Sequence, residues 1–512
     1  MSKNKRNSKL SFGKYLSIFL IIVSALVLLL VYFINVLPLE YFVILVILVL
    51  ITDLFAIMML LSKGKVRNAI GIVITIILLI VMILGITYEL NTLDFLKQFG
   101  FNSYKTEIYN VIVLQDSEYK SLDDLNDLSI AHLDLDTHQG LNDAVTKIKN
   151  EIDFTSTIGE DISDLTNILT TDEEPAIILE DAQLSIVEEE SPEVYNELRI
   201  IYSVEVEIEI AEIGEAVDVT KDSFNILISG IDTYGSITKV SRSDVNILVT
   251  VNPSTHNILL TSIPRDYYVL IPEFNEYDKL THAGIYGIET SVSTIENLLD
   301  TKINYYVKVN FTSVIDIVDA IGGITVDSSY DFTTQDGYHF TKGTNELDGE
   351  EALSFARERK SFADGDRVRG ENQELILTAI INKAMSASII TDYVALLSAL
   401  NDKFVTNITD EEITNFIKKQ ISEMPSWTID SISLDGTDAY DYTYSYQKQK
   451  LYVMKPYQES IINAQERINS TLLTWKSVKL TLFSLPQIVS ICRRCLKWNK
   501  YPLYLVCKVI TC

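Results

Sequence analysis

Three long apolar runs open the chain, and shorter apolar runs separated by polar stretches fill the remainder. The runs at 15–37, 41–61 and 69–88 each approach the roughly 20 residues that a membrane-spanning helix needs. A cleaved signal peptide has a shorter apolar core and a small-residue cleavage site, and two further spans do not follow it at once. The pattern therefore predicts three retained transmembrane helices within 15–88.

The distribution of positive charge predicts how these helices are oriented. Basic residues precede the first run and lie between the second and third, whereas the loop at 38–40 carries none. They are Lys3, Lys5, Arg6, Lys9, Lys14, Lys63, Lys65 and Arg67. Because positively charged loops stay in the cytoplasm, residues 1–14 are expected inside the cell and everything after Tyr88 outside. Asp53 falls within the second run, either as a helix-packing residue or as a functional one.

Outside the membrane the pattern first indicates a small α/β domain at 104–218, an accessory domain. Short apolar runs at 111–114, 176–179 and 200–204 alternate with helix-like stretches such as 141–152. The domain is acidic, and its cluster of Glu188, Glu189, Glu190 and Glu193 is interpreted as a solvated face. Its His132 and His138 have neither cysteine nor a close carboxylate framework, so a metal site is not expected there.

A second α/β pattern follows, and it predicts a larger domain at 222–390. Strands are expected at 224–231, 245–251, 258–263 and 305–309, with helical segments between them. The turn Asn252-Pro253-Ser254-Thr255 predicts a hairpin between the second and third of these strands. Strand, turn and strand followed by helices favour a mixed sheet with helices on both faces, an α-β-α arrangement. Residues 391–475 are expected to form a C-terminal extension of the region outside the cell.

Composition limits the classes of partner and of metal site that the chain is expected to have. A formal net charge of −28 would repel DNA or RNA, so nucleic acid is not expected as a partner. All four cysteines lie in the segment 476–512, which has seven Lys or Arg and no acidic residue. Cys492, Cys495, Cys507 and Cys512 allow a zinc site, but the break in composition favours an aberrant tail. A cysteine-free exterior part is compatible with the cell surface.

The chemistry-bearing residues of the second domain are carboxylates and arginines. Conventional nucleophile, nucleotide and zinc-protease motifs are missing. Asp232 and Asp244 flank neighbouring strand ends, as do Arg242 and Arg265, and four more arginines crowd into 357–369. Surface ion pairing is one account of these charges. The other is a phosphate site at the edge of the sheet, where guanidinium groups bind phosphate oxygens and two carboxylates hold Mg²⁺.

Seven ordered blocks of residues resemble the catalytic domain of the LytR–CpsA–Psr family. They are Gly230-Ile-Asp232, Arg242-Ser-Asp244, Ser262-Ile-Pro-Arg265-Asp266, Lys279 with His282-Ala283, Gly322-Gly323-Ile324, Ala352-Leu-Ser-Phe-Ala-Arg357-Glu-Arg359 and Gly365-Asp-Arg367-Val-Arg369-Gly-Glu-Asn-Gln373. Their order and spacing match over about 150 residues. The three-span anchor and the acidic domain resemble the streptococcal capsule-locus branch of that family, where the middle segment is termed the accessory domain.

The resemblance implies a membrane-anchored transferase outside a Gram-positive cell. It would transfer the glycosyl phosphate of a polyprenyl-pyrophosphate-linked glycopolymer, expected to be capsular polysaccharide, to a hydroxyl of peptidoglycan and release polyprenyl phosphate. Pyrophosphatase activity is expected as a side reaction, and the capsule polymerisation machinery as a further partner. Such phosphoryl transfer depends mainly on positioning and on stabilisation of charge, so no covalent nucleophile is required.

By the same resemblance, Asp232 and Asp244 would hold Mg²⁺, with Mn²⁺ as the alternative. The implied pyrophosphate ligands are Arg242, Arg265, Arg357, Arg359, Arg369 and Gln373, with Arg367 and Lys279 as further candidates. Asp232, Asp244, Arg242 and Arg265 are the expected catalytic group, and either Asp244 or Asp266 would accept the proton of the attacking hydroxyl.

Several alternatives stay open at this stage. Arg367 could instead pair with Asp364 or Asp366, and Lys279 could be a surface lysine. His282 is interpreted as a hydrogen-bonded structural residue rather than an acid or a base. The apolar faces of 285–299 and 375–390 are candidates to line a tunnel for the polyprenyl chain, and ordinary core packing is the alternative for both.

Two rival functions remain beside the transferase. One is a regulator of capsule synthesis, since family members have been described as transcription attenuators. The predicted topology argues against direct DNA contact, because it separates the arginine-rich domain from the chromosome. The other is a non-catalytic subunit that binds lipid-linked glycan, which predicts binding without turnover.

Overall fold

A computed structural model describes residues 12–35, 37–98, 104–135, 139–231, 237–362, 365–386 and 403–473. The expected residues Asp232, His138 and Asp364, the tail 476–512 and its cysteines lie outside these ranges.

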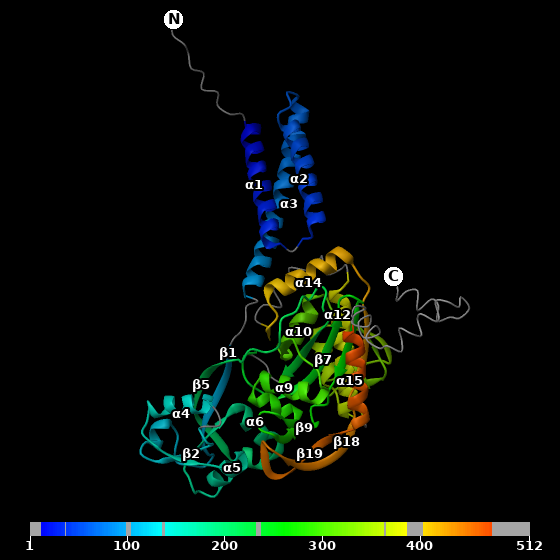
Figure 1. The fold of residues 1–512 in the computed structure, drawn as a ribbon. Coiled ribbons are helices and arrows are strands. Elements are labelled where there is room, and N and C mark those ends of the chain that lie inside the picture. Colours follow the sequence, from blue (N-terminus) through cyan, green and yellow to red (C-terminus); the bar gives the residue numbers. More distant parts are fainter. Residues whose placement is uncertain are drawn as a thin grey trace, which may run out of the picture.

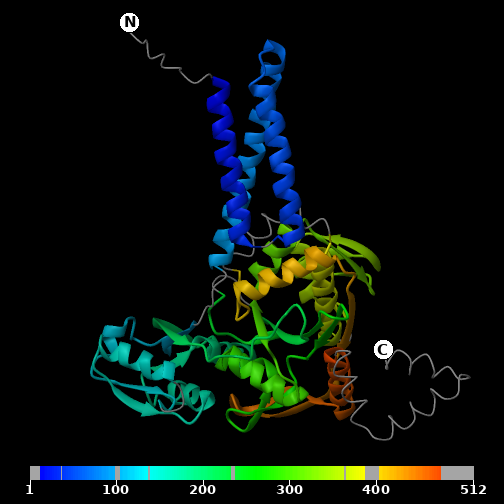
Figure 2. The same ribbon diagram turned by 45° about the horizontal axis from the view of Figure 1, so that its top comes forward.

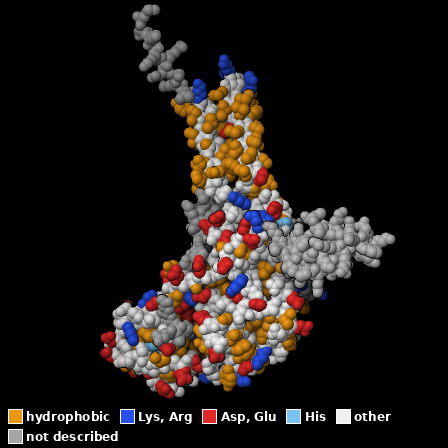
Figure 3. Space-filling model, viewed as in Figure 1, with side chains coloured by type: hydrophobic (Ala, Val, Ile, Leu, Met, Phe, Trp, Pro, Cys, Tyr) orange, Lys and Arg blue, Asp and Glu red, His pale blue; other side chains and the backbone are white. Residues whose placement is uncertain are grey.

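Three helices at the N-terminus confirm the predicted spans. They are α1 (Phe12–Ile34), α2 (Leu39–Leu60) and α3 (Lys65–Gln98), and each is long and apolar enough to cross a membrane. They form a bundle that carries many hydrophobic side chains on the face seen in Figure 3, with basic side chains at the end farthest from the rest of the molecule. Asp53 is buried within this bundle. At the other end, α14 (Asp410–Glu423) lies beneath the helices (Figures 1 and 2).

The accessory region, residues 104–209, forms a five-stranded mixed sheet in the order β3-β2-β4-β1-β5. Its strands are β1 (Tyr104–Leu114), β2 (Ser129–His132), β3 (Thr155–Ile158), β4 (Ile177–Glu180) and β5 (Leu198–Glu209). Its helices are η1 (Leu122–Leu125), α4 (Gln139–Lys149), α5 (Ile162–Thr170), α6 (Asp181–Glu190) and α7 (Pro192–Tyr195). Hydrophobic clusters cover the sheet, so the predicted small α/β fold is confirmed for this region.

The central sheet has six strands in the order β16-β11-β6-β7-β8-β17. They are β6 (Phe224–Ile231), β7 (Ser243–Asn252), β8 (Asn257–Ser262), β11 (Tyr305–Val309), β16 (Phe404–Thr406) and β17 (Thr428–Ser433). Strands β6, β7 and β8 are antiparallel neighbours, whereas β11 pairs with β6, and β17 with β8, in parallel. The predicted strands, the hairpin turn at 252–255 and the mixed sheet are therefore confirmed. Residues 403–473 add two strands to this same sheet.

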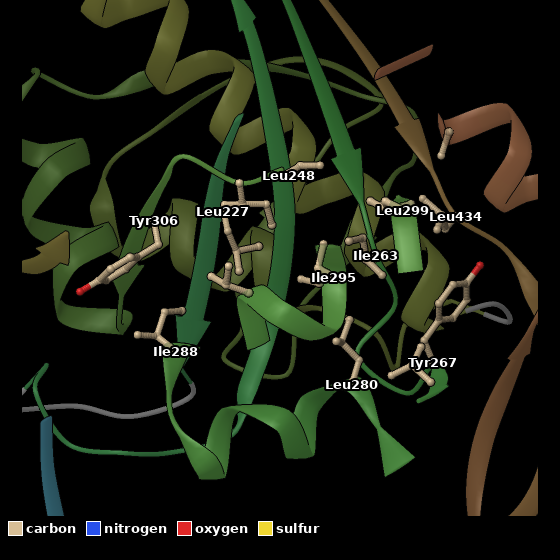
Figure 4. Packing of buried hydrophobic residues seen from close by; sticks show 14 of the residues in the cluster. Leu227, Leu248, Ile263, Tyr267, Leu280, Ile288, Ile295, Leu299, Tyr306 and Leu434 are labelled. Atoms are coloured by element: carbon tan, nitrogen blue, oxygen red, sulfur yellow. The ribbon is translucent and has the colours of Figure 1, made fainter. Parts of the chain in front are cut away.

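Helices cover both faces of the central sheet. On one face lie α9 (Ile288–Leu299) and α15 (Gln458–Leu472), packed on Leu227, Leu248 and Leu259 (Figure 4). On the other lie α10 (Phe311–Ala320), α11 (Gly349–Arg357), α12 (Gly365–Ala384) and α14. The smaller elements are β9 (Tyr268–Ile271), β10 (Glu276–Lys279), α8 (Leu280–Ala283), η2 (Gly284–Tyr286), β12 (Ile324–Ser328), β13 (Phe332–Thr333), β14 (His339–Phe340), β15 (Gly343–Leu347), β18 (Gly436–Thr443) and β19 (Tyr446–Pro456).

The accessory region is joined to the central part by hydrogen bonds and ion pairs. The Thr106 amide donates to the Thr238 carbonyl at 3.1 Å, and the Val240 amide donates to the Thr106 carbonyl at 3.1 Å. Lys105 Nζ lies 2.7 Å from Glu289 Oε1, and both side chains are largely buried. In Figure 1, α6 lies at this junction. Its C-terminal turn reaches the central part, because Glu189 pairs with Arg265.

Candidate anion-binding cavity

A cavity of about 580 Å³ opens on the face of the central sheet that carries α10, α11 and α12. That volume is in the range of small-molecule sites. Strands β6, β7 and β11 form its floor through Ile228, Ile247 and Val307. Side chains alternate between the two faces of a strand, which is why Leu227 and Leu248 enter the core opposite while their neighbours line the cavity.

Charged groups gather where β6 ends and β7 begins. Arg242, Asp244 and Arg265 all line the cavity. Arg265 Nη1 donates to Asp244 Oδ1 at 2.7 Å, and Thr281 Oγ1 lies 3.4 Å from the same oxygen. Burial acts to raise the pKa of Asp244, but Arg265 and Arg242 outweigh it and hold that pKa below its ordinary value. The positive charge around Asp244 therefore favours its ionised form.

Helices α11 and α12 supply the opposite wall of the charged end. Arg357 is the last residue of α11, and its guanidinium stacks 4.1 Å from the centre of the Phe311 ring. Arg359 follows α11, while Arg369 and Gln373 are one turn apart on α12, and all three line the cavity. The cavity thus brings together Asp244, Arg242, Arg265, Arg357, Arg359, Arg369 and Gln373, seven of the residues expected from sequence.

Along α10 and α12 the lining becomes apolar. Ile376, Leu377 and Ile380 continue the stripe begun by Arg369 and Gln373 along α12. Val314 and Ile317 of α10 face the same space. From Arg369 to Ile380 the helix advances about 16 Å, so the surface that α12 contributes changes from polar and cationic to hydrophobic along its length. Such a site suits a ligand with an anionic head and a hydrocarbon tail.

Two of the expected phosphate ligands lie elsewhere. Arg367 does not line the cavity, and its guanidinium pairs with Asp435 at 2.8 Å. Lys279 is buried rather than a surface lysine, with Nζ 2.6 Å from Glu190 Oε1 and 3.7 Å from Asp266 Oδ1. Asp266 is likewise absent from the cavity lining, which leaves Asp244 as the expected proton acceptor that faces it.

His282 has the structural surroundings expected of it. Its Nδ1 lies 2.6 Å from Asp278 Oδ1, and both side chains are fully buried. The other oxygen of Asp278 accepts a hydrogen bond from the Ser445 amide at 2.7 Å.

Of the two alternatives left open for 285–299, the structure shows core packing: Val292, Ile295 and Leu299 of α9 pack into the core on the face of the sheet opposite the cavity. One sequence interpretation is wrong. The glutamates at the end of α6 are not a purely solvated face. Glu189 lines the cavity and pairs with Arg242 and Arg265, and Glu190 pairs with Lys279.

Glu189 is a site residue that sequence reasoning missed. Its partners are 53 and 76 residues away in the chain, and the contact depends on how the accessory region docks. No local motif could have indicated it. Gln335, Asp336 and Asn310 also line the cavity without a sequence signal.

One carboxylate of the cavity fits a divalent cation. Among the described side chains, Asp244 Oδ2 is a buried oxygen without a hydrogen-bond partner, and it faces the cavity. Mg²⁺ takes one or two carboxylates and completes its shell with substrate oxygens and water. No group of three or more His, Cys, Asp or Glu ligands occurs among the described residues, so an all-protein metal cage is not formed by them.

Comparison with known proteins gives a match to the model of the LytR_cpsA_psr family over residues 197–460. This range starts at the accessory strand β5 and ends within α15, and it contains the whole central sheet.

Curated relatives agree with this match. Over 209 residues the chain is 38% identical to the polyisoprenyl-teichoic acid–peptidoglycan teichoic acid transferase TagU of Bacillus anthracis. This alignment covers 41% of this chain and 68% of the relative. The protein of the same name from Bacillus subtilis is 40% identical over 190 residues, 37% of this chain and 61% of its own. The crystal structure of Bacillus subtilis TagV aligns with a TM-score of 0.43 at 32% identity, covering 49% of this chain and 98% of that one.

Proposed function

Since the chain belongs to the LytR–CpsA–Psr family, we propose that it transfers a lipid-pyrophosphate-linked glycopolymer to peptidoglycan. The relatives named above are transferases of polyisoprenyl-linked teichoic acid to peptidoglycan. The proposed reaction is of the same kind: a hydroxyl oxygen of peptidoglycan attacks the phosphorus next to the glycan. The bond from that phosphorus to the bridging oxygen breaks, and polyprenyl phosphate leaves with the bridging oxygen.

The observation that carries this proposal is the change of character along the cavity. Five arginines and Gln373 line one part, and aliphatic residues of α10 and α12 line the other. A polyprenyl pyrophosphate has the matching division between a diphosphate and a hydrocarbon chain. Guanidinium groups bind phosphate oxygens in a fixed fork geometry, and their charge stabilises the transition state of phosphoryl transfer.

Each charged residue has a proposed role in this reaction. Arg242, Arg265, Arg357, Arg359 and Arg369, with Gln373, bind the diphosphate oxygens. Asp244 accepts the proton of the attacking hydroxyl or, with Asp232, holds Mg²⁺. When bound there, the cation would neutralise charge on the phosphate oxygens. Without an acceptor hydroxyl, attack by water would give the pyrophosphatase side reaction.

The proposal also covers the identity of the transferred glycopolymer and the orientation of the protein in the membrane. The three-helix anchor and the accessory region resemble the capsule-locus branch of the family, so we propose capsular polysaccharide as the glycopolymer. The basic side chains at the far end of the helices favour a cytoplasmic N-terminus and an exterior central sheet (Figure 3). In that orientation α14 lies at the outer membrane surface, and the cavity is within reach of lipid-linked substrates.

The test is turnover of a defined lipid substrate. Full-length protein in detergent would be incubated with a polyprenyl pyrophosphate and Mg²⁺, and phosphate release would be followed. We expect release by the wild type and a loss of about 100-fold or more in Arg265→Ala, the size of effect seen when one transition-state donor is removed. Folded wild-type protein that binds the lipid without releasing phosphate would instead support the binding-only function.

A second measurement identifies the glycopolymer that is transferred and tests whether peptidoglycan is the acceptor. Cells that lack the protein would be analysed for polymer covalently bound to peptidoglycan, with capsular and teichoic acid components quantified separately. Loss of bound capsular polymer supports the proposed cargo, and loss of teichoic acid alone would contradict it.

A further inference from the structure

A carboxylate from the accessory region lies between the two arginines at the charged end of the cavity. Glu189 Oε1 accepts a hydrogen bond from Arg265 Nη2 at 2.9 Å, and Glu189 Oε2 pairs with Arg242 Nη1. One carboxylate therefore bridges two guanidinium groups with its two oxygens. Phosphate oxygens are also acceptors for guanidinium groups.

The backbone around Glu189 is fixed to the central part of the molecule. Next to it, the Glu190 side chain pairs with buried Lys279 at 2.6 Å, and the Glu190 carbonyl accepts a hydrogen bond from Gln449 Nε2 at 2.9 Å. One residue further, Ser191 Oγ lies 2.6 Å from the hydroxyl of Tyr446, and both residues are buried. The two residues that follow Glu189 are thus held against the central part, and this places Glu189 at the cavity.

The Glu189 side chain is partly exposed to solvent. About a third of its surface is exposed, against 11% for Arg265 and 18% for Arg242. A glutamate can turn about its side-chain bonds into solvent without displacing the helix. An anion that enters this end of the cavity competes with Glu189 for the same guanidinium donors.

We propose that Glu189 is an internal competitor for the anion subsite formed by Arg242 and Arg265. The inference rests on the proposed function, because it assumes that a diphosphate binds to these arginines. While Glu189 pairs with them, its charge and that of Asp244 together offset the two guanidinium charges, and weak anions are excluded. A diphosphate, with more charge and more oxygens than a carboxylate, displaces it. When product leaves, the carboxylate returns to the arginines and opposes rebinding.

The test compares binding of inorganic pyrophosphate, with Mg²⁺ present, to full-length protein in detergent by isothermal titration calorimetry. If Glu189 occupies the arginines about nine-tenths of the time, its removal tightens apparent binding about tenfold. We therefore expect Glu189→Gln to lower the dissociation constant about tenfold. Glu193→Gln, an exposed glutamate on the adjacent helix α7, is the matched control and is expected to bind as the wild type does.

The outcomes separate this inference from the proposed function. Equal binding by wild type and Glu189→Gln would overturn the inference and leave the function intact. Weaker binding by Glu189→Gln, with an unchanged thermal unfolding midpoint, would mean that Glu189 assists the ligand and would also overturn it. If no form, Glu189→Gln included, binds pyrophosphate, the proposed function itself fails. Should Glu189→Gln fail to fold, Glu189→Asp, which shortens the side chain by one methylene, is expected to tighten binding in the same direction, and unchanged or weaker binding by it would count against the inference.

Discussion

The two faces of the central sheet are made from alternate residues of the same strands, but they serve different ends. On one face, Leu227 and Leu248 are fully buried under α9 and α15 (Figure 4). On the other, Ile228 and Ile247 form the floor of a cavity roofed by α10, α11 and α12. Both sets are aliphatic, so hydrophobicity does not distinguish them.

The difference lies in the helices. α9 and α15 place aliphatic side chains on the sheet and fill the space. α12 and the end of α11 instead direct arginines toward one end of the sheet, where a cavity remains. Charged side chains are costly to bury unless they are paired, so they do not fill a core as aliphatic side chains do. We infer that stability resides mainly on the first face and ligand binding on the second.

The largest expected effect is on the free energy of unfolding, and it is tested with two leucines, one from each face of the sheet. Leu227→Ala, in the filled core, should lower the free energy of unfolding by about 2–5 kcal/mol, the range for a fully buried leucine. Leu377→Ala, on the cavity wall, removes fewer contacts and should cost about 1 kcal/mol. Urea unfolding followed by circular dichroism measures both. Equal losses at the two positions would mean that the second face is as tightly packed as the first.

An intermediate effect is expected on the rate of phosphate release, and it is tested with two arginines of α12. Arg369→Ala should reduce phosphate release from polyprenyl pyrophosphate about 100-fold, since it removes a guanidinium from the cavity. Arg367→Ala removes a half-exposed pair with Asp435 and should change the rate less than about twofold. Initial rates at saturating lipid provide the comparison. The reverse order would assign Arg367 to the phosphate site and reject the geometry described above.

The smallest expected effect is the pH dependence of Asp244. Its pKa is held below the ordinary value, so its stabilising contribution is fully present above the unfolded pKa of about 3.9. The contribution is lost as the pH falls through the lower pKa of the folded state. The difference in unfolding free energy between wild type and Asp244→Asn should therefore be constant from about pH 5 to 7 and shrink below about pH 4. A change in that difference between pH 5 and 7 would contradict the ion pair with Arg265.

Much of the fold could be predicted because it depends on local pattern. The three spans follow from long, mainly apolar runs, and β6, β7, β8 and β11 follow from short aliphatic runs bounded by turns. The site was only partly predictable. The density of arginines at 357–369 indicated an anion site, but the pattern did not identify which of them face the cavity.

Arg367 and Arg369 illustrate the limit. Two residues apart on a helix, they point about 200° away from each other, so both cannot face the same cavity. The sequence shows this spacing, but it does not show which face of the helix packs toward the sheet. Docking of α12 decides that Arg369 lines the cavity while Arg367 pairs with Asp435.

The sequence by itself determined the membrane anchor, the strands of the central sheet and the supply of carboxylates and guanidinium groups, because each depends on neighbouring residues. Only the tertiary structure decided which face of the sheet holds the cavity, which arginines enter it, and that Glu189 reaches them from the accessory region. These features depend on contacts between segments many residues apart, and such contacts form through packing and charge pairing that leave no local pattern in the chain.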